Sequence, residues 1–258
     1  MDGPNERHHH GGYAHAEAIK SGGPFAENTA WCKAEEAKIM LNIGGYKPAE
    51  ELVKDALKRS PNNFHLLLTQ AKAESAMKKY DAAIETYKKA IAIAPQIEAV
   101  VALGDVYAVV GKPEEAKKQY ALVEEISKLN TANGVKGEMQ IAQFYADHDI
   151  KLPEALKIAE EEYQTRKSVY AADTLAWCYY KNNRLPEAKK LSDVAVSRKT
   201  PEALFLYHQG MIASKSGDIS TAKQKLYEAV SLSSNFHPIY ARIAEAEIKR
   251  LGETSQTN

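Results

Sequence analysis

The sequence predicts an all-α fold in which helical hairpins repeat along the chain and stack into a solenoid. The pattern is clearest in residues 171–190, AADTLAWCYYKNNRLPEAKK. There an apolar stripe recurs at the spacing of one helix face and ends at Asn182, and Pro186 suits the first turn of a second helix. The stripe consists of Ala172, Leu175, Ala176 and Tyr179.

Two series of small residues repeat in phase along the rest of the chain. One lies in the first helix of each hairpin and comprises Ala37, Ala71, Gly104, Ala142, Ala176, Gly210 and Ala244. The other lies near the start of each second helix, at successive spacings of 34, 33, 39, 33 and 34 residues, and comprises Ala49, Ala83, Ala116, Ala155, Ala188 and Ala222. Because helices approach to about 8–10 Å only where contact residues are small, the two series predict closely packed, stacking hairpins.

The period divides the chain into six hairpins and one final helix. The hairpins are expected at residues 30–63, 64–97, 97–130, 135–168, 169–202 and 203–236. The first helix is expected to open near Pro24 and to stop at Gly44 and Gly45. Second helices are expected to open with a proline or a capping residue, at Pro48, Asp81, Pro113, Pro153, Pro186 and Ser220. Residues 237–251 carry the charged outer face that the end of an array needs.

The segments around the array divide the chain into three parts. Residues 1–24 are rich in Gly, His and Pro and are expected to form a flexible arm, and residues 252–258 a flexible tail. The array then occupies residues 25–251. Between the third and fourth hairpins the spacing is longer, through the segment LNTANGVKG. This segment is either a loop insertion or a bend near residues 130–135 between two halves of the array.

The positions around the small residues follow a fixed order. In the third hairpin the order is Val100, Leu103, Gly104 and Tyr107, then Ala116 and Tyr120. This order resembles the tetratricopeptide repeat family, although Glu36, Gln70 and Gln209 stand where Leu is usual. The segments DTLAWCYY and FLYHQGMIA are most similar to the repeats of bacterial proteins. The resemblance implies a right-handed superhelix of tetratricopeptide-like hairpins with a C-terminal capping helix.

The resemblance also implies a function, because first helices of such arrays line a concave groove that binds a partner segment. We therefore expect a non-catalytic protein–protein interaction scaffold whose partner is another protein or peptide segment. The surface is expected to centre on Trp177, since Trp and Tyr combine large apolar area with a polar handle. The alternative is that its aromatic residues belong to the core. The expected groove residues are Met139, Gln143, Tyr170, Asp173, Trp177, Tyr180, Lys181, Tyr207 and Met211.

Several other function classes are disfavoured by the sequence. It contains no GxxxxGK[ST], HExxH or GxSxG motif, so neither an enzyme nor a cofactor is expected. Basic and acidic residues balance at 34 each, which argues against binding nucleic acid. No apolar run approaches the about 20 residues of a membrane helix, and no membrane insertion is expected. The chain is expected in the cytoplasm, or alternatively as an exported protein whose signal peptide has been removed.

Histidines in the N-terminal arm provide the alternative function. Imidazoles can ligate Zn, Ni or Cu, but a flexible arm lacks the fixed geometry of a structural site, so we assign no metal site. The alternative is an accessory subunit or assembly factor of a larger complex, with a metal-handling arm that contains His8, His9, His10 and His15. Cys32 and Cys178 are expected to be free thiols. The sequence specifies no oligomeric state.

Overall fold

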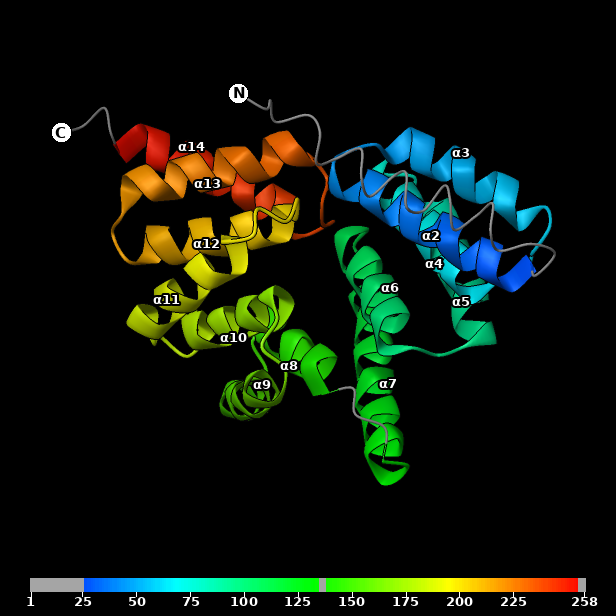
Figure 1. Cartoon of the computed structure of the whole chain (residues 1–258), viewed down its shortest axis with the longest axis horizontal. Coiled ribbons are helices and arrows are strands. Elements are labelled where there is room, and N and C mark those ends of the chain that lie inside the picture. Colours follow the sequence, from blue (N-terminus) through cyan, green and yellow to red (C-terminus); the bar gives the residue numbers. More distant parts are fainter. Residues whose placement is uncertain (1–25, 135–137, 255–258) are drawn as a thin grey trace. The chain divides into compact units, whose positions relative to one another are not determined.

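The computed structural model describes residues 26–134 and 138–254, which contain thirteen α-helices and no strand (Figure 1). The helices are α2 (Ala26–Asn42), α3 (Tyr46–Leu57), α4 (Phe64–Ala76), α5 (Tyr80–Ile93), α6 (Ile97–Val109), α7 (Pro113–Ala132), α8 (Glu138–Asp147), α9 (Leu152–Thr165), α10 (Val169–Lys181), α11 (Leu185–Val196), α12 (Ala203–Lys215), α13 (Ile219–Leu232) and α14 (Tyr240–Thr254). The expected N-terminal arm and Pro24 lie outside the described residues.

The chain divides into two compact units. Unit 1 ends at Ala116, in the first turn of α7, and unit 2 begins at Lys117. The division precedes residues 130–135, where the sequence indicates either a loop or a bend, and that bend stays a prediction.

Consecutive helices pack as hairpins within each unit. In unit 1 the hairpins are α2 with α3 and α4 with α5, and in unit 2 they are α8 with α9, α10 with α11 and α12 with α13. First helices also contact one another, α2 with α4, α8 with α10, and α10 with α12. Most helix bounds fall within the predicted hairpins, although α2 begins before residue 30 and α7 continues past residue 130. The all-α repeat architecture is confirmed.

Both series of small residues lie in the helix contacts. Ala37, Ala71, Ala142 and Ala176 are fully buried, as are their counterparts in the second helices. At Gly210 an added Cβ would lie 2.7 Å from Cγ of Leu226 and 3.2 Å from its backbone nitrogen. Carbon atoms do not pack this closely, so glycine is what allows α12 to approach α13. The predicted role of the small residues is therefore confirmed.

The turn inside each hairpin repeats one unusual backbone conformation. A residue with positive φ, the left-handed region, follows each first helix at Gly44, Lys78, Gly111, Asp149, Asn183 and Gly217. Glycine adopts this conformation most easily, and Asn and Asp tolerate it better than most residues. Lys78, with φ of 60°, is thus the exception in the series. The turns follow the repeat even where their sequences differ.

The starts of the second helices match the sequence in part. Pro48, Pro113, Pro153 and Pro186 lie in first turns, as predicted. The predicted caps Asp81 and Ser220 are wrong, because both lie inside their helices. Helix α5 starts after Lys79 without a side-chain cap. Helix α13 is capped by Asp218, whose Oδ1 accepts a hydrogen bond from the Thr221 backbone N–H at 3.1 Å.

Helix α14 follows the last hairpin, as the sequence predicts, but it runs from Tyr240 to Thr254. Residues 252–254 therefore belong to the helix and not to the expected flexible tail. The inner side of α14 packs on α12 and α13 and buries Tyr240, Ala241, Ala244 and Leu251. Its outer side exposes Arg242, Glu245, Lys249 and Arg250, which is the charged face expected of a capping helix.

Candidate partner-binding surface

All nine residues expected to bind a partner lie in unit 2, on three neighbouring first helices. Helix α8 carries Met139 and Gln143, and α12 carries Tyr207 and Met211. The other five belong to α10, which packs between these two helices: Tyr170, Asp173, Trp177, Tyr180 and Lys181. The structure therefore brings the expected residues together on one run of helices.

Trp177 lies at the centre of an aromatic stack. Its ring is nearly parallel to that of Tyr180, with centroids 4.7 Å apart, and to that of His208, 4.1 Å away. Tyr240 of α14 meets it edge-on at 6.1 Å. Rings from α10 itself, from α12 and from α14 thus surround the indole, and only 1% of Trp177 is exposed.

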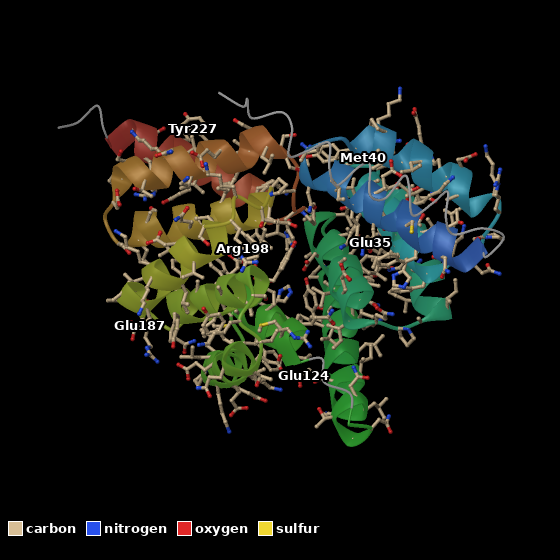
Figure 2. The ribbon with its side chains drawn as sticks, viewed as in Figure 1. Glu35, Met40, Glu124, Glu187, Arg198 and Tyr227 are labelled. Carbon is tan, nitrogen blue, oxygen red and sulfur yellow. The ribbon has the colours of Figure 1, made fainter. Side chains whose placement is uncertain are left out.

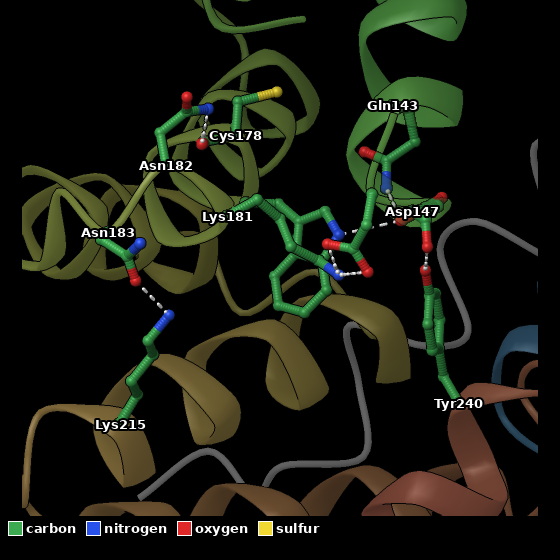
Figure 3. Close-up of polar contacts among 10 residues, drawn as sticks. Gln143, Asp147, Cys178, Lys181, Asn182, Asn183, Lys215 and Tyr240 are labelled. Carbon is green, nitrogen blue, oxygen red and sulfur yellow. Dashed lines mark hydrogen bonds and ion pairs between the residues drawn. The ribbon is translucent and has the colours of Figure 1, made fainter. Parts of the chain in front are cut away.

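Asp147, at the C-terminal end of α8, holds the polar edge of this stack. Its Oδ1 accepts hydrogen bonds from Nε1 of Trp177 at 2.8 Å and from Nε2 of Gln143 at 2.9 Å. Its backbone carbonyl accepts one from the Tyr240 hydroxyl at 3.3 Å (Figure 3). One residue therefore connects α8, α10 and α14, and it satisfies the indole N–H, which would be costly to bury unpaired.

A second polar pair lies inside the stack. Nδ1 of His208 hydrogen-bonds with Oδ2 of Asp173 at 2.8 Å, and both side chains are buried. Within the described part of the chain, Nε2 of His208 and Oδ1 of Asp173 have no hydrogen-bond partner. Buried polar groups gain most from a bond inside the low-dielectric interior, so this pair ties α10 to α12 strongly.

The burial of three residues corrects the expectation that the surface is centred on Trp177. Trp177 and Tyr207 are each 1% exposed, and Asp173 is 2% exposed. The physical reason is that each first helix is covered by the first helices on either side, and α14 extends that cover with Tyr240. For these three residues the alternative of a core position describes the structure. Whether the other six contact a partner stays a prediction.

Several of the expected residues remain accessible. Tyr170 is 54% exposed, and Tyr180, Lys181 and Met211 are partly exposed. We call Tyr180, Lys181 and Met211 the rim. Nζ of Lys181 lies 5.1 Å from the Trp177 ring centre and forms an ion pair with Asp149 at 2.8 Å. These contacts hold the lysine stem against the ring and its charge at the surface.

The next hairpin repeats this arrangement of a lysine over an aromatic ring. Nζ of Lys215 donates to Oδ1 of Asn183 at 2.6 Å and lies 4.8 Å from the Tyr180 ring centre (Figure 3). In both repeats the lysine that ends a first helix reaches the left-handed turn residue of the preceding hairpin. Tyr180 is thus held between Trp177 and Lys215.

Burial keeps the tyrosines of this region neutral. It raises the pKa of Tyr180 and Tyr207 above the usual value, and nearby carboxylates act in the same direction. Burial likewise raises the pKa of the Cys178 thiol. An unionised, buried thiol is disfavoured as a nucleophile.

Sequence reasoning did not identify His208 or Tyr240 as part of this cluster. The position in the next hairpin that is equivalent to Asp173 is Tyr207, and His208 is the residue after it. A comparison of equivalent repeat positions therefore does not pair Asp173 with His208. Tyr240 could have been identified from the sequence as an aromatic residue near the start of the capping helix.

Among the described residues no three His, Cys, Asp or Glu side chains are grouped to hold a metal ion, and His8–His10 and His15 lie outside them. No helix in the described part is long and apolar enough to cross a membrane.

Comparison with known proteins agrees with this arrangement. Residues 64–97, the α4–α5 hairpin, match the sequence model of the tetratricopeptide repeat family. A tetratricopeptide repeat protein from the bacterium Parabacteroides merdae has a TM-score of 0.54 and 15% identity, over 91% of this chain and 90% of that one. The chain has a tetratricopeptide repeat fold.

Two further proteins are similar to this chain over part of their own length. A chain of the APC/C hetero-tetramer Cut9-Hcn1 has a TM-score of 0.51 and 13% identity, over 93% of this chain and 45% of that one. Small glutamine-rich tetratricopeptide repeat-containing protein 2 of Saccharomyces cerevisiae is 28% identical over 142 residues, 53% of this chain and 41% of that protein. This chain therefore matches less than half the length of each. At these structural identities the likeness defines the fold alone.

Proposed function

We propose that this tetratricopeptide protein is a non-catalytic interaction scaffold that binds a segment of another protein along the first helices of unit 2. The repeat fold supports the interaction role, since stacked hairpins expose a continuous surface that suits an extended partner. A protein of similar fold assembles with a partner in the Cut9-Hcn1 hetero-tetramer. We propose an analogous role here without assigning the same partner.

The observation that carries the proposal is the rim of Tyr180, Lys181 and Met211. Tyr180 is stacked on Trp177 and approached by Lys215, so its ring is already ordered before a partner arrives. A pre-ordered aromatic side chain loses little conformational entropy on binding, which favours it as an anchor. Met211, on the next first helix, is partly exposed and supplies an adaptable apolar side chain.

The charges of the rim indicate the chemistry of the partner. Lys181 pairs with Asp149, and Lys215 is bonded to Asn183. Because these cations are already engaged, the rim lacks the bare cation pair that would clamp a terminal carboxylate. A partner segment with one apolar or aromatic anchor and mixed charge fits best, since its charges can replace Asp149 and Asn183 as partners of the two lysines.

The test is a selection of binding peptides from a random display library on the full chain. Affinities are then measured for Tyr180→Ala combined with Met211→Ala, which removes the proposed anchors. Binding should weaken by about 2 kcal/mol, roughly 30-fold. The matched control combines Tyr227→Ala and Val194→Ala, which removes exposed apolar side chains from second helices of the same unit. Equal losses in both variants, or no loss in the first, would exclude the rim as the binding surface.

A further inference from the structure

Four exposed cations occur on two neighbouring turns of unit 2. Arg166 and Lys167 lie between α9 and α10, and Arg198 and Lys199 lie between α11 and α12. Figure 2 labels Arg198 at one end of α11 and Glu187 at the other. Over the described residues none of the four forms an ion pair, whereas the cations at the opposite turns of these hairpins, such as Lys151 and Arg184, do. We call these four residues the basic edge.

Direct contacts join the two turns. The ring of Tyr170, just after the first turn, packs edge-on against Phe205, just after the second, with centroids 5.2 Å apart. The Tyr170 hydroxyl also donates a hydrogen bond to Oε1 of Glu202 at 3.2 Å. The turns are therefore neighbours in space as well as in the repeat, and the half-exposed ring of Tyr170 lies at their junction.

The backbone of both turns is held in place. The Arg166 N–H donates to the Glu162 carbonyl at 2.8 Å, and the Lys199 N–H donates to the Val196 carbonyl at 3.0 Å. Lys199 has a φ of 53°, in the left-handed region that glycine adopts more easily. The side chains of the basic edge thus extend from fixed positions, although their ends remain exposed.

The carboxylates near the basic edge reduce its positive charge without removing it. Glu161 lies 4.0 Å from Lys157 in an ion pair, so its charge is already compensated. Glu202, which accepts from the neutral Tyr170 hydroxyl, and the partly buried Glu162 keep their charges. Four cations without ion-pair partners outnumber these two carboxylates, so a local positive potential remains.

We propose that the basic edge is a second interaction surface, which binds an acidic protein segment with several Asp or Glu carboxylates. Guanidinium groups bind carboxylates in pairs of parallel hydrogen bonds, lysines add point charges, and Tyr170 offers an apolar contact between them. The chain's formal net charge is zero, so it lacks the overall positive charge that attracts a long polyanion such as nucleic acid. A short acidic segment matches the size of the patch. The assignment does not depend on the rim of Tyr180 and Met211.

The test measures fluorescence anisotropy of a labelled polyglutamate peptide titrated with the full chain. Wild-type binding should weaken as salt increases. The edge variant combines Arg166→Gln, Lys167→Gln, Arg198→Gln and Lys199→Gly, and it should bind about tenfold more weakly or worse. The control variant loses the same charge elsewhere on unit 2, through Lys118→Gln, Lys190→Gln, Arg242→Gln and Lys249→Gln, all exposed. It should stay within about twofold of wild type. Circular dichroism verifies that both variants are folded.

Several outcomes would overturn the proposal. Absence of polyglutamate binding, equal weakening in the two variants, or unchanged binding in the edge variant would remove the site. A single-stranded DNA oligonucleotide or phosphatidylserine vesicles could bind more tightly than polyglutamate and lose that binding in the edge variant. Either result would overturn the proposal that the ligand is an acidic protein segment.

Tyr170→Ala should weaken polyglutamate binding several-fold and Tyr170→Phe should not. The Tyr180→Ala and Met211→Ala variant should bind polyglutamate normally, so failure of the rim and failure of the edge are distinguishable.

Discussion

Unit 1 and unit 2 use the same helical hairpins but place different side chains between them. In unit 1 buried carboxylates connect helices: Glu50 accepts from Lys79 at 3.0 Å, and Glu74 accepts from the Thr86 hydroxyl at 2.8 Å. In unit 2 an aromatic stack around Trp177 connects α8, α10, α12 and α14. The same backbone arrangement therefore allows helices to be connected through buried carboxylates or through an aromatic stack.

One equivalent position makes the difference concrete. Lys72 and Trp177 each follow the small residue of their first helix, Ala71 and Ala176. Lys72 pairs with Glu98 on the next first helix, and Trp177 bonds to Asp147 on the preceding one. Both side chains bridge neighbouring hairpins. The small residues thus determine the repeat, and the residues beside them determine how neighbouring repeats are joined.

The largest effect on stability is expected for Trp177 of unit 2, and Trp31 of unit 1 is its comparison. Trp177→Ala removes a buried ring with its stacking partners and should lower the free energy of unfolding by about 3–5 kcal/mol. Trp31, on α2, is 49% exposed, and Trp31→Ala should cost about 1 kcal/mol or less. Equilibrium unfolding followed by circular dichroism measures both. Equal small losses would return Trp177 to an open surface and remove the contrast between the units.

A smaller, pH-dependent effect is expected in unit 1. Burial raises the pKa of Glu50, but hydrogen bonds and charges from Lys54 and Lys79 outweigh it and lower the pKa below its usual 4.5. A lowered pKa in the folded state contributes stability above pH 4.5 that is lost as pH falls through the folded value. Glu50→Gln should therefore lower stability at neutral pH, by about 1–2 kcal/mol, and have progressively less effect in acid.

The neighbouring exposed residue provides the control for this effect. Glu51→Gln should change stability by about 0.5 kcal/mol or less at neutral pH. Urea unfolding of both variants from neutral to acidic pH separates the two positions. If the loss of stability caused by Glu50→Gln stayed constant across this pH range, the charge of the carboxylate would not be the source of its contribution.

The smallest effect compares left-handed turns of the two units. Lys78→Gly in unit 1 relieves a lysine at a φ of 60° and should stabilise the protein by up to about 1 kcal/mol. Asn183→Gly in unit 2 should give no gain, because Asn tolerates this conformation and its side chain accepts from Lys215. Thermal unfolding compares the two variants. A larger gain at Asn183 than at Lys78 would contradict this account of the turns.

The sequence by itself determined the hairpins, because each signal for them is local. Helical periodicity, small residues such as Gly210 at close contacts, and prolines in first turns act within one or two neighbouring helices. Repetition along the chain made those signals reliable. It also placed the expected binding residues of unit 2 on consecutive first helices.

Only the tertiary structure decided which of those residues are accessible. Periodicity identifies the apolar face of a helix, but it does not specify which distant residues cover it. Trp177 is buried because His208 of the next hairpin and Tyr240 of the capping helix close over it. In the same way, the cations of the basic edge are pairs of neighbours in the sequence, and packing of Tyr170 against Phe205 joins the pairs. Burial and neighbourhood depend on contacts between repeats, which the pattern within a single repeat does not contain.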